Sequence, residues 1–243
     1  MAVDTKGSSY SKQHKNPLNY TKTHDAPYRY LAYRDIPQII KKYLQGGEAL
    51  DYGAGTGYST HFLSQLGFNV VGVDINKEMV HQAQLQYPNF SFYPVENRVV
   101  PFKDSTFDLV FSCFVLLEIS TQQDMIDYLL EARRVMKKTA SLFVAITGSE
   151  HLHDVSKKWL DFSTDFPENK KLLSGHMVKL FHYHSQIEFS DYYWTLKDYR
   201  NFFVKAGFHL LEVKFPLGKK EESFSWKDEL VSSPSTIFVA IPK

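Results

Sequence analysis

Residues 49–60 read ALDYGAGTGYST: an apolar stretch runs into Asp51, and glycine then fills every second position at 53, 55 and 57. Glycine lets the backbone turn sharply and approach a ligand with no Cβ in the way. In open α/β sheets, ligands bind beyond the carboxyl ends of the strands, where such a strand–helix turn lies. A tight turn that needs glycine for its geometry alone is the alternative, but three alternating glycines favour a ligand-binding turn.

The sequence on both sides of this turn alternates between apolar strand segments and amphipathic helix segments. The strand segments are EALDY, NVVGVD, NFSFYPV, FDLVFSCFVLL, SLFVAIT, HLLEVKF and STIFVAI. Such alternation indicates a mostly parallel sheet with helices on both faces. Residues 216–234 carry no helical pattern, so the last two strands should form a hairpin. We therefore predict an α/β fold: a doubly wound, seven-stranded, mostly parallel, Rossmann-like sheet with its last strand antiparallel.

The remaining segments suggest how this domain is organised. Residues 1–18 are polar and are expected to form a mobile N-terminal arm. Residues 19–243 are expected to form a single domain, in which residues 19–45 make an N-terminal helical cap that breaks near Pro37. Residues 149–195 interrupt the alternation and show no clear strand. We expect them to form a helical insertion, or lid, over the active site.

Composition narrows the possible functions. The formal net charge is +1 and no long basic run occurs, which argues weakly against a nucleic-acid partner. A single cysteine, Cys113, rules out a disulfide within the chain and fits a reducing, cytoplasmic location. The first residues are polar and no 18 apolar residues run together, so we expect neither a secretory signal nor a membrane span. No metal site is expected.

The spacing of the glycines separates the possible ligands. A dinucleotide loop, G-x-G-x-x-G, would place its third glycine where Tyr58 stands, and no lysine follows as a phosphate-binding loop requires. The pattern D-x-G-x-G-x-G instead resembles the first motif of class I S-adenosylmethionine-dependent methyltransferases of the small-molecule type. The resemblance implies S-adenosylmethionine as cofactor and S-adenosylhomocysteine as product, with the acid near the cofactor's amino group. The residues that it assigns to the cofactor here are Asp51, Tyr52, Gly53, Ala54, Gly55 and Gly57.

Later segments resemble further motifs of the same family, in the same order. Asp74 ends NVVGVD, where a carboxylate would accept hydrogen bonds from both ribose hydroxyls. Ile75 and Met79 would pack on the adenine, although both also suit an ordinary core. Residues 92–112 resemble the stretch whose acid accepts from the adenine amino group. The resemblance assigns this contact to Glu96 and Asn97, and the surroundings of the methyl-bearing sulfur to Cys113 and Phe114 of SCFVLLEIS.

Residues that contact the methyl acceptor are harder to assign. Methyl transfer is an in-line displacement on an activated donor, so a base is needed only if the acceptor must lose a proton. Glu118 follows the fourth strand and could hold a cation or take a proton; a solvent-facing role is equally compatible with its position. His182, His184 and Tyr193 are further candidates, the two histidines sharing a face if they lie on a strand. An arginine of the cap could hold the cofactor's carboxylate, and we favour Arg34 slightly over Arg29.

These observations predict a methyltransferase that acts on a small-molecule acceptor, as a monomer or homodimer. Methylation of RNA or protein is a weaker alternative, because neither a basic patch nor the D/N-P-P-Y/F/W tetrapeptide is present. A non-catalytic S-adenosylmethionine-binding protein would also keep the glycine motif and Asp74. A nicotinamide-dependent oxidoreductase is disfavoured by Tyr58.

Overall fold

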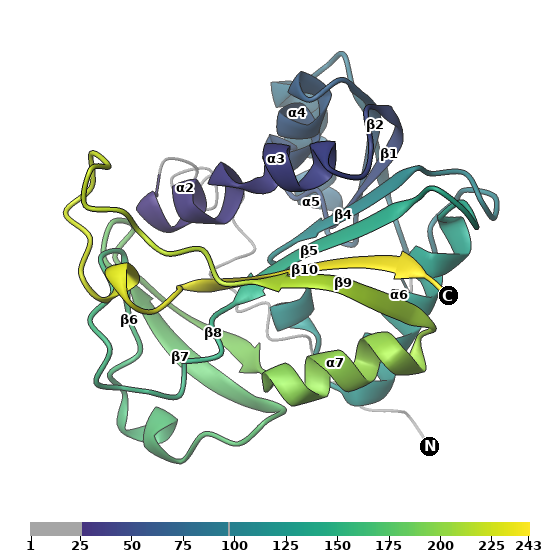
Figure 1. The fold of residues 1–243 in the computed structure, drawn as a ribbon. Coiled ribbons are helices and arrows are strands. Elements are labelled where there is room, and N and C mark those ends of the chain that lie inside the picture. Colours follow the sequence, from purple (N-terminus) through teal and green to yellow (C-terminus); the bar gives the residue numbers. More distant parts are fainter. Residues whose placement is uncertain (1–25, 97) are drawn as a thin grey trace.

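A seven-stranded sheet forms the centre of the computed structural model, which describes residues 26–96 and 98–243. The strand order is β3–β2–β1–β4–β5–β10–β9 (Figure 1). Neighbours from β3 to β5 are parallel, and β10 is antiparallel to both β5 and β9. The predicted α/β fold with an antiparallel last strand is thus confirmed. The strands are β1 Gly47–Tyr52, β2 Phe68–Asp74, β3 Ser91–Pro94, β4 Leu109–Cys113, β5 Leu142–Gly148, β9 Phe208–Lys214 and β10 Ser235–Pro242.

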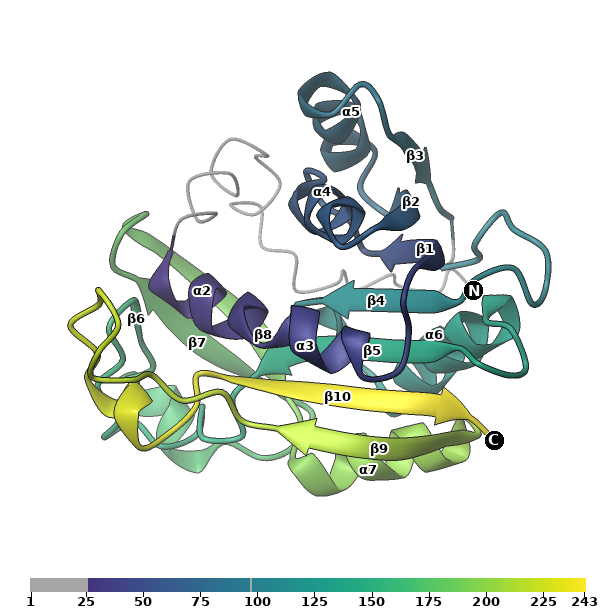
Figure 2. The same cartoon turned by 45° about the horizontal axis from the view of Figure 1, so that its top comes forward.

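Helices cover both faces of this sheet. Side chains of α3 and α4 pack on one face and those of α6 and α7 on the other (Figure 2). The predicted break in the cap lies at Asp35, with Pro37 in the first turn of the helix that follows. The predicted arm of residues 1–18 lies outside the described residues. The helices are α2 Pro27–Arg34, α3 Ile36–Lys41, α4 Tyr58–Gln65, α5 Lys77–Gln86, α6 Gln122–Val135 and α7 Leu196–Lys205, with short 3₁₀ turns η1 Leu116–Glu118, η2 Pro167–Lys171 and η3 Asp228–Leu230.

The strand order places the glycine turn at the point where the sheet changes direction. Strand β1 lies between β2 and β4, so the chain winds outward from β1 first to one side and then to the other. The carboxyl ends of β1 and β4 diverge at such a switch point and leave a crevice for a ligand. The glycine turn follows the carboxyl end of β1 directly.

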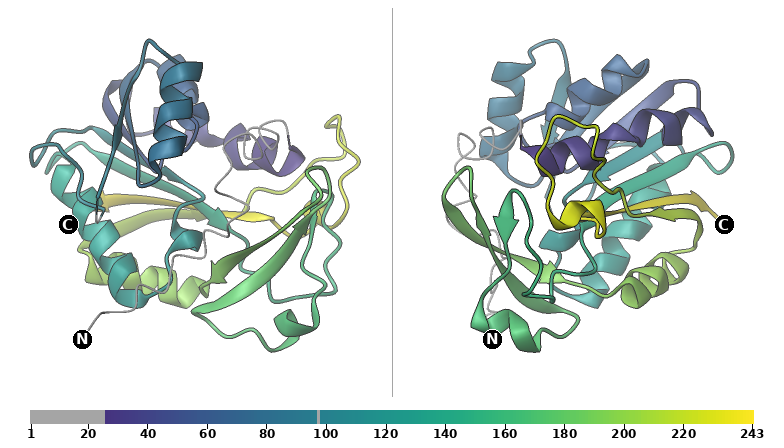
Figure 3. Two further views of the ribbon diagram at one scale, coloured as in Figure 1. Left: turned by 180° about the vertical axis from the view of Figure 1, so that it is seen from behind. Right: turned by 60° about the vertical axis from the view of Figure 1, so that its left-hand side comes forward.

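The insertion is a small antiparallel sheet, so the expectation of a helical lid is wrong. Strands β6 (Phe162–Ser163), β7 (His176–His182) and β8 (Ile187–Tyr193) pair in that order. The sheet stands beyond the carboxyl ends of β4 and β5 (Figures 1 and 3). Its strands alternate buried and more exposed positions, which is the pattern of a half-buried sheet. Asp191 and His182 are polar residues at buried positions of these strands. The hydrophobicity of the sequence therefore does not show the alternation.

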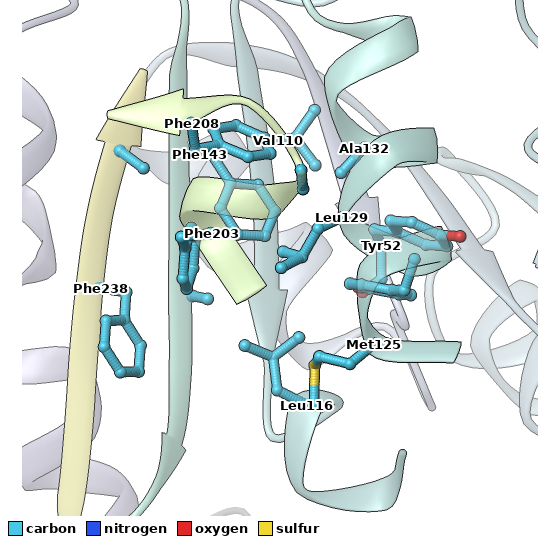
Figure 4. Close-up of a cluster of buried hydrophobic side chains, with 14 of the residues drawn as sticks. Tyr52, Val110, Leu116, Met125, Leu129, Ala132, Phe143, Phe203, Phe208 and Phe238 are labelled. Atoms are coloured by element: carbon cyan, nitrogen blue, oxygen red, sulfur yellow. The ribbon is translucent and has the colours of Figure 1, made fainter. Parts of the chain in front are cut away.

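Aromatic side chains fill the core between the sheet and helices α6 and α7. Phe203 of α7 packs against Phe143 of β5, Phe208 of β9 and Phe238 of β10, with ring centroids 5.2–5.8 Å apart (Figure 4). Thr195 begins α7 by accepting a hydrogen bond from the backbone N–H of Asp198. The cap and the aromatic face together fix α7 to the sheet.

The fully buried Phe203 and its exposed neighbour Val204 give a test of this packing. Phe203→Ala should lower the free energy of unfolding by about 3–5 kcal/mol, because it removes a large buried ring and leaves a cavity. Val204 is 58% exposed on the same helix, so Val204→Ala should change stability by no more than about 0.5 kcal/mol. Urea titrations of both variants measure the difference, and equal losses would contradict the assigned core.

Candidate functional site

The turn after β1 has no space for side chains at two of its glycines. A Cβ on Gly53 would lie 2.2 Å from Cγ2 of Val115, and φ at Gly53 is +95°. A Cβ on Gly57 would lie 2.7 Å from the Tyr87 ring, with φ at +90°. Both positions therefore need glycine for conformation and for close approach. The turn brings the backbone of β1 against the segment that follows β4, at the switch point.

Asp51 lies fully buried under this turn. Its Oδ2 accepts hydrogen bonds from the hydroxyls of Ser59 and Thr60, each at 2.6 Å. Its Oδ1 has no hydrogen-bond partner within residues 26–96 and 98–243. Burial raises the pKa of Asp51 to about 6, and the charge of nearby Asp74 adds to the rise. A buried carboxylate oxygen without a partner is costly, so a ligand that donates to it or carries positive charge would be stabilised there.

Asp74 ends β2 beside the turn. Its Oδ2 accepts from the backbone N–H of Gly55 and its Oδ1 from the backbone N–H of Asn76, both at 2.8 Å. Burial raises its pKa, and these backbone hydrogen bonds partly oppose the rise. The backbone N–H of Ile75 acts on the same carboxylate, which can accept four hydrogen bonds in all, so acceptor capacity remains for a ligand. A pair of neighbouring hydroxyls would suit that arrangement.

The residues predicted around the adenine occupy unequal environments. Ile75 is 57% exposed immediately after Asp74, whereas Met79 is fully buried in α5. The Glu96 side chain is 79% exposed and lies 3.3 Å from the Lys77 ammonium. Asn97 lies outside the described residues. Ile75 and Glu96 are thus accessible from solvent, while Met79 serves the packing of α5.

Tyr52 and Cys113 lie at the ends of β1 and β4, and the side chains of both are buried. The Tyr52 ring stacks on Tyr128 with centroids 4.1 Å apart, and its hydroxyl donates to the carbonyl of Arg98. Its side chain therefore belongs to the core, and only its backbone borders the turn. Burial raises the pKa of the Cys113 thiol to about 12, so this cysteine stays protonated and is no nucleophile at neutral pH.

Phe114 joins the end of β4 to the cap helix. Its φ is +56°, a left-handed conformation that is uncommon for a bulky residue and typical of functional sites. Its ring lies 5.6 Å from the Tyr28 ring, and the Arg29 guanidinium lies 5.9 Å above it. Arg29 is buried, and its charge acts on the Cys113 thiol. Helix α2 thus delivers Arg29 to the carboxyl end of β4.

Arg34, which the sequence favoured over Arg29, is engaged elsewhere. Its guanidinium forms a two-bond pair with Asp35 and donates to Glu222 and to the carbonyl of Leu217. These contacts tie α2 to the loop between β9 and β10. Arg29, by contrast, contacts Phe114, a residue that the resemblance assigns to the cofactor.

The four predicted catalytic side chains do not converge on one point. His182 is buried at the end of β7, whereas His184 lies exposed in the following turn, so they share no face. The Tyr193 hydroxyl donates to the carbonyl of Glu150 and therefore fixes the loop after β5. Glu118 is half-buried in η1, directly after β4.

The hydrogen bonds of His182 indicate which ring nitrogen carries the proton. Nδ1 accepts from the backbone N–H of Ser185 at 3.3 Å, so the neutral ring carries its proton on Nε2. In this tautomer His182 is a hydrogen-bond donor at Nε2 rather than a base there. The ring also packs 5.7 Å from Tyr28, which brings the insertion sheet against α2.

The insertion contains two buried carboxylates, Asp161 and Asp191, that were not predicted from the sequence. Asp161 accepts from the backbone N–H of Tyr28, and burial raises its pKa to about 6. Asp191 is 5% exposed on β8, and burial raises its pKa to about 7. The alternation of Ile187, Phe189, Asp191 and Tyr193 was the signal available, because it predicts a strand with Asp191 on its buried face.

Two negative findings concern the described part of the chain alone. Across residues 26–96 and 98–243, no group of three or more histidine, cysteine, aspartate or glutamate side chains could hold a metal ion. Within the same ranges, no helix has the length and apolar character that crossing a lipid bilayer requires.

Comparison with known proteins agrees with this geometry. Residues 49–139 match a family model described as a methyltransferase domain. A demethylmenaquinone methyltransferase of Tropheryma whipplei is 36% identical over 101 residues, which are 41% of each chain. A malonyl-[acyl-carrier protein] O-methyltransferase of Erwinia billingiae is 28% identical over 128 residues, covering 53% of this chain and 50% of the relative. The chain thus spans half of these two relatives or less. An N-demethylindolmycin N-methyltransferase of Streptomyces griseus is 28% identical over 175 residues, covering 68% of this chain and 70% of the relative.

Solved structures share the whole architecture at low sequence identity. A protein of Pyrococcus horikoshii superposes with a TM-score of 0.65 at 21% identity, covering 90% of this chain and 93% of that one. A putative S-adenosylmethionine-dependent methyltransferase of Listeria monocytogenes gives 0.65 at 16% identity, covering 88% and 97%. At these identities the likeness shows the fold. Residues 49–139, which include the glycine turn and Asp74, thus form a methyltransferase domain, and the chain shares the fold of solved S-adenosylmethionine-dependent methyltransferases.

Proposed function

We propose that this protein transfers a methyl group from S-adenosylmethionine to a small-molecule acceptor. The observation that carries the proposal is the buried Asp51 Oδ1, which lacks a partner in the described chain and lies under the glycine turn. The ammonium group of the cofactor's methionine part would supply the positive charge that this oxygen lacks. Asp74 would hold the ribose hydroxyls through the acceptor capacity that its backbone hydrogen bonds leave.

The fit extends to the two ends of the cofactor. Arg29 would hold its carboxylate from the cap side, because a guanidinium binds a carboxylate through two parallel hydrogen bonds. Ile75 and Glu96 would border the adenine from the solvent side. S-adenosylmethionine, when bound, supplies a methyl group on a positively charged sulfur. The protein's own residues then bind, orient and keep water from the reacting groups, which can account for about 7–11 kcal/mol of the barrier.

The position of the insertion sheet and the net charge of the chain support a small-molecule acceptor. The insertion sheet and α2 meet over the carboxyl end of β4 through Tyr28, Phe114 and His182, which leaves an aromatic and largely buried setting. The net charge of +1 and the lack of a long basic run in the sequence argue weakly against a nucleic-acid partner. Relatives are named for malonyl-[acyl-carrier protein], demethylmenaquinone and N-demethylindolmycin, so the atom methylated varies among them.

Calorimetric titration with S-adenosylmethionine and S-adenosylhomocysteine, with NAD as the control ligand, tests the proposal directly. Asp74→Ala should weaken both cofactor affinities tenfold or more, or about 1.4 kcal/mol, because it removes the carboxylate that would accept from the ribose hydroxyls. Glu96→Ala should weaken them less, because that side chain is largely solvated. Absence of saturable binding to the wild-type chain would refute the proposed function.

The buried position of Asp51 gives a pH-dependent prediction. A folded pKa of about 6 means that the carboxyl is neutral below that pH and charged above it. Affinity for S-adenosylmethionine should therefore rise as pH increases from 5 to 7. Asp51→Asn keeps an oxygen for Ser59 and Thr60 but removes the charge, so this variant should bind more weakly and lose that rise. An unchanged pH profile in the variant would contradict the role of Asp51.

Arg29 and Arg34 form a matched pair for the carboxylate contact. Arg29→Met should weaken S-adenosylmethionine binding about tenfold or more, because it removes a charged hydrogen-bond donor of similar side-chain length. Arg34→Met should leave the affinity within about twofold, since Arg34 is engaged by Asp35 and Glu222. Equal losses in both variants would assign the effect to the fold of α2 instead.

A further inference from the structure

Asp191 is a buried carboxylate that the cofactor site does not use. It lies on β8 opposite Val178 of β7, on the face of the insertion sheet that also carries Phe189 and Tyr193. Only 5% of the residue is exposed. Burial raises the pKa of Asp191 and no hydrogen bond opposes the rise, whereas backbone N–H groups oppose it at the comparable Asp74. A charged carboxylate is costly in such a setting, so a ligand that supplies positive charge and hydrogen-bond donors would be stabilised there.

The position of Asp191 is at the acceptor end of the molecule. Its charge acts on the Tyr199 hydroxyl, which lies 3.0 Å from the Thr147 hydroxyl at the carboxyl end of β5. Strand β8 also packs against η1, the turn that follows β4. The indole N–H of Trp194, just after β8, donates to the carbonyl of Ile119, just after η1. Strand β8, which carries Asp191, therefore packs beside the turn that follows β4, and Asp191 acts on a hydroxyl beside the end of β5. Figure 1 shows β8 at this end of the central sheet.

We propose that Asp191 binds the amino group of an amine acceptor and takes its proton as the methyl group is transferred. This assignment rests on the proposed function and adds the class of acceptor to it. An ammonium group supplies positive charge and hydrogen-bond donors to the buried carboxylate. A hydroxyl acceptor fits less well, because an alcohol is a far weaker acid than an ammonium group and a carboxylate is a weak base towards it.

The reaction balances with Asp191 as the proton acceptor. The amine nitrogen loses one proton to the Asp191 carboxylate, and its lone pair forms the new bond to the methyl carbon. The carbon–sulfur bond breaks, and its electron pair stays on sulfur as a neutral thioether. The proton then leaves Asp191 for solvent. Burial raises the pKa of Asp191 to about 7, which suits a group that must take and release a proton near neutral pH.

Asp191→Asn tests the assignment, with Glu188→Gln as the control. Glu188 is an exposed carboxylate on the same strand and faces the other way. Phenethylamine and its neutral counterpart 2-phenylethanol serve as probes, titrated without cofactor. The wild-type chain and Glu188→Gln should bind the amine at least tenfold more tightly than the alcohol. Asp191→Asn should lose that preference and, with S-adenosylmethionine present, lose amine methylation at least a hundredfold while cofactor binding stays unchanged.

Stability against pH gives a second readout that needs no ligand. A carboxyl whose pKa is higher in the folded than in the unfolded chain lowers stability as pH rises between the two values. The unfolding temperature of Asp191→Asn should therefore exceed that of the wild type by an amount that grows from pH 4 to pH 7 and is constant above. The titratable groups on the elements packed against this part of the sheet are Tyr199 on α7, Glu118 in η1, and His176 and Lys179 on β7. They are the same in both chains, so the difference reports the titration of Asp191 together with the pKa changes that it causes in its neighbours, Tyr199 among them.

The outcomes separate this proposal from the proposed function. Failure of the wild type to bind S-adenosylmethionine refutes methyl transfer, and with it the role of Asp191 as a base. Cofactor binding with equal amine and alcohol affinity in the wild type, or an amine preference kept by Asp191→Asn, overturns the Asp191 assignment alone. A variant that is less stable than the wild type at pH 8 would also overturn it, because a buried carboxylate in this setting should be costly to keep charged.

Discussion

The close approach of Val115 to Gly53 is the constraint on which the rest of the site depends. Because Gly53 has no side chain, Cγ2 of Val115 can occupy the space where a Cβ would lie. The segment after β4 is thereby held against the turn after β1, and the bend places Phe114 in a left-handed conformation. Phe114 then meets Tyr28 and Arg29 of the cap helix. One missing methyl group thus couples the cofactor turn to the elements that cover it.

The parallel part of the sheet and the glycine turn could be predicted from the sequence because their signals are local. Apolar strand runs, the spaced glycines and the acid that ends β2 each follow from a few consecutive residues, and the sheet order follows from their alternation with helices. No such local signal distinguishes Arg29 from Arg34. The two arginines lie five positions apart on one helix, and only the packing of α2 on Phe114 and on the β9–β10 loop separates their roles.

The insertion sheet, which would border the acceptor, was hard to predict for a physical reason. In β7 and β8 the buried face includes His182 and Asp191, so hydrophobicity does not alternate as it does in an ordinary half-buried strand. Polar groups at buried positions weaken the pattern that sequence reasoning uses, and they are also the groups that a ligand site requires. The buried polar residues therefore explain both why the strands of the insertion were not predicted and why the insertion carries candidate binding groups.

The way in which the insertion joins the chain has a consequence for how such proteins diversify. It leaves the sheet after β5 and returns at Thr195, which begins α7. Both junctions border the site, while the turn after β1 and the end of β2 belong to a separate stretch of sequence. If the insertion selects the acceptor, as proposed, mutations between the junctions would alter which compound is modified while the donor site is inherited intact. Such a segment can change in evolution as a unit, and recombination between relatives at these two points would exchange one substrate preference for another.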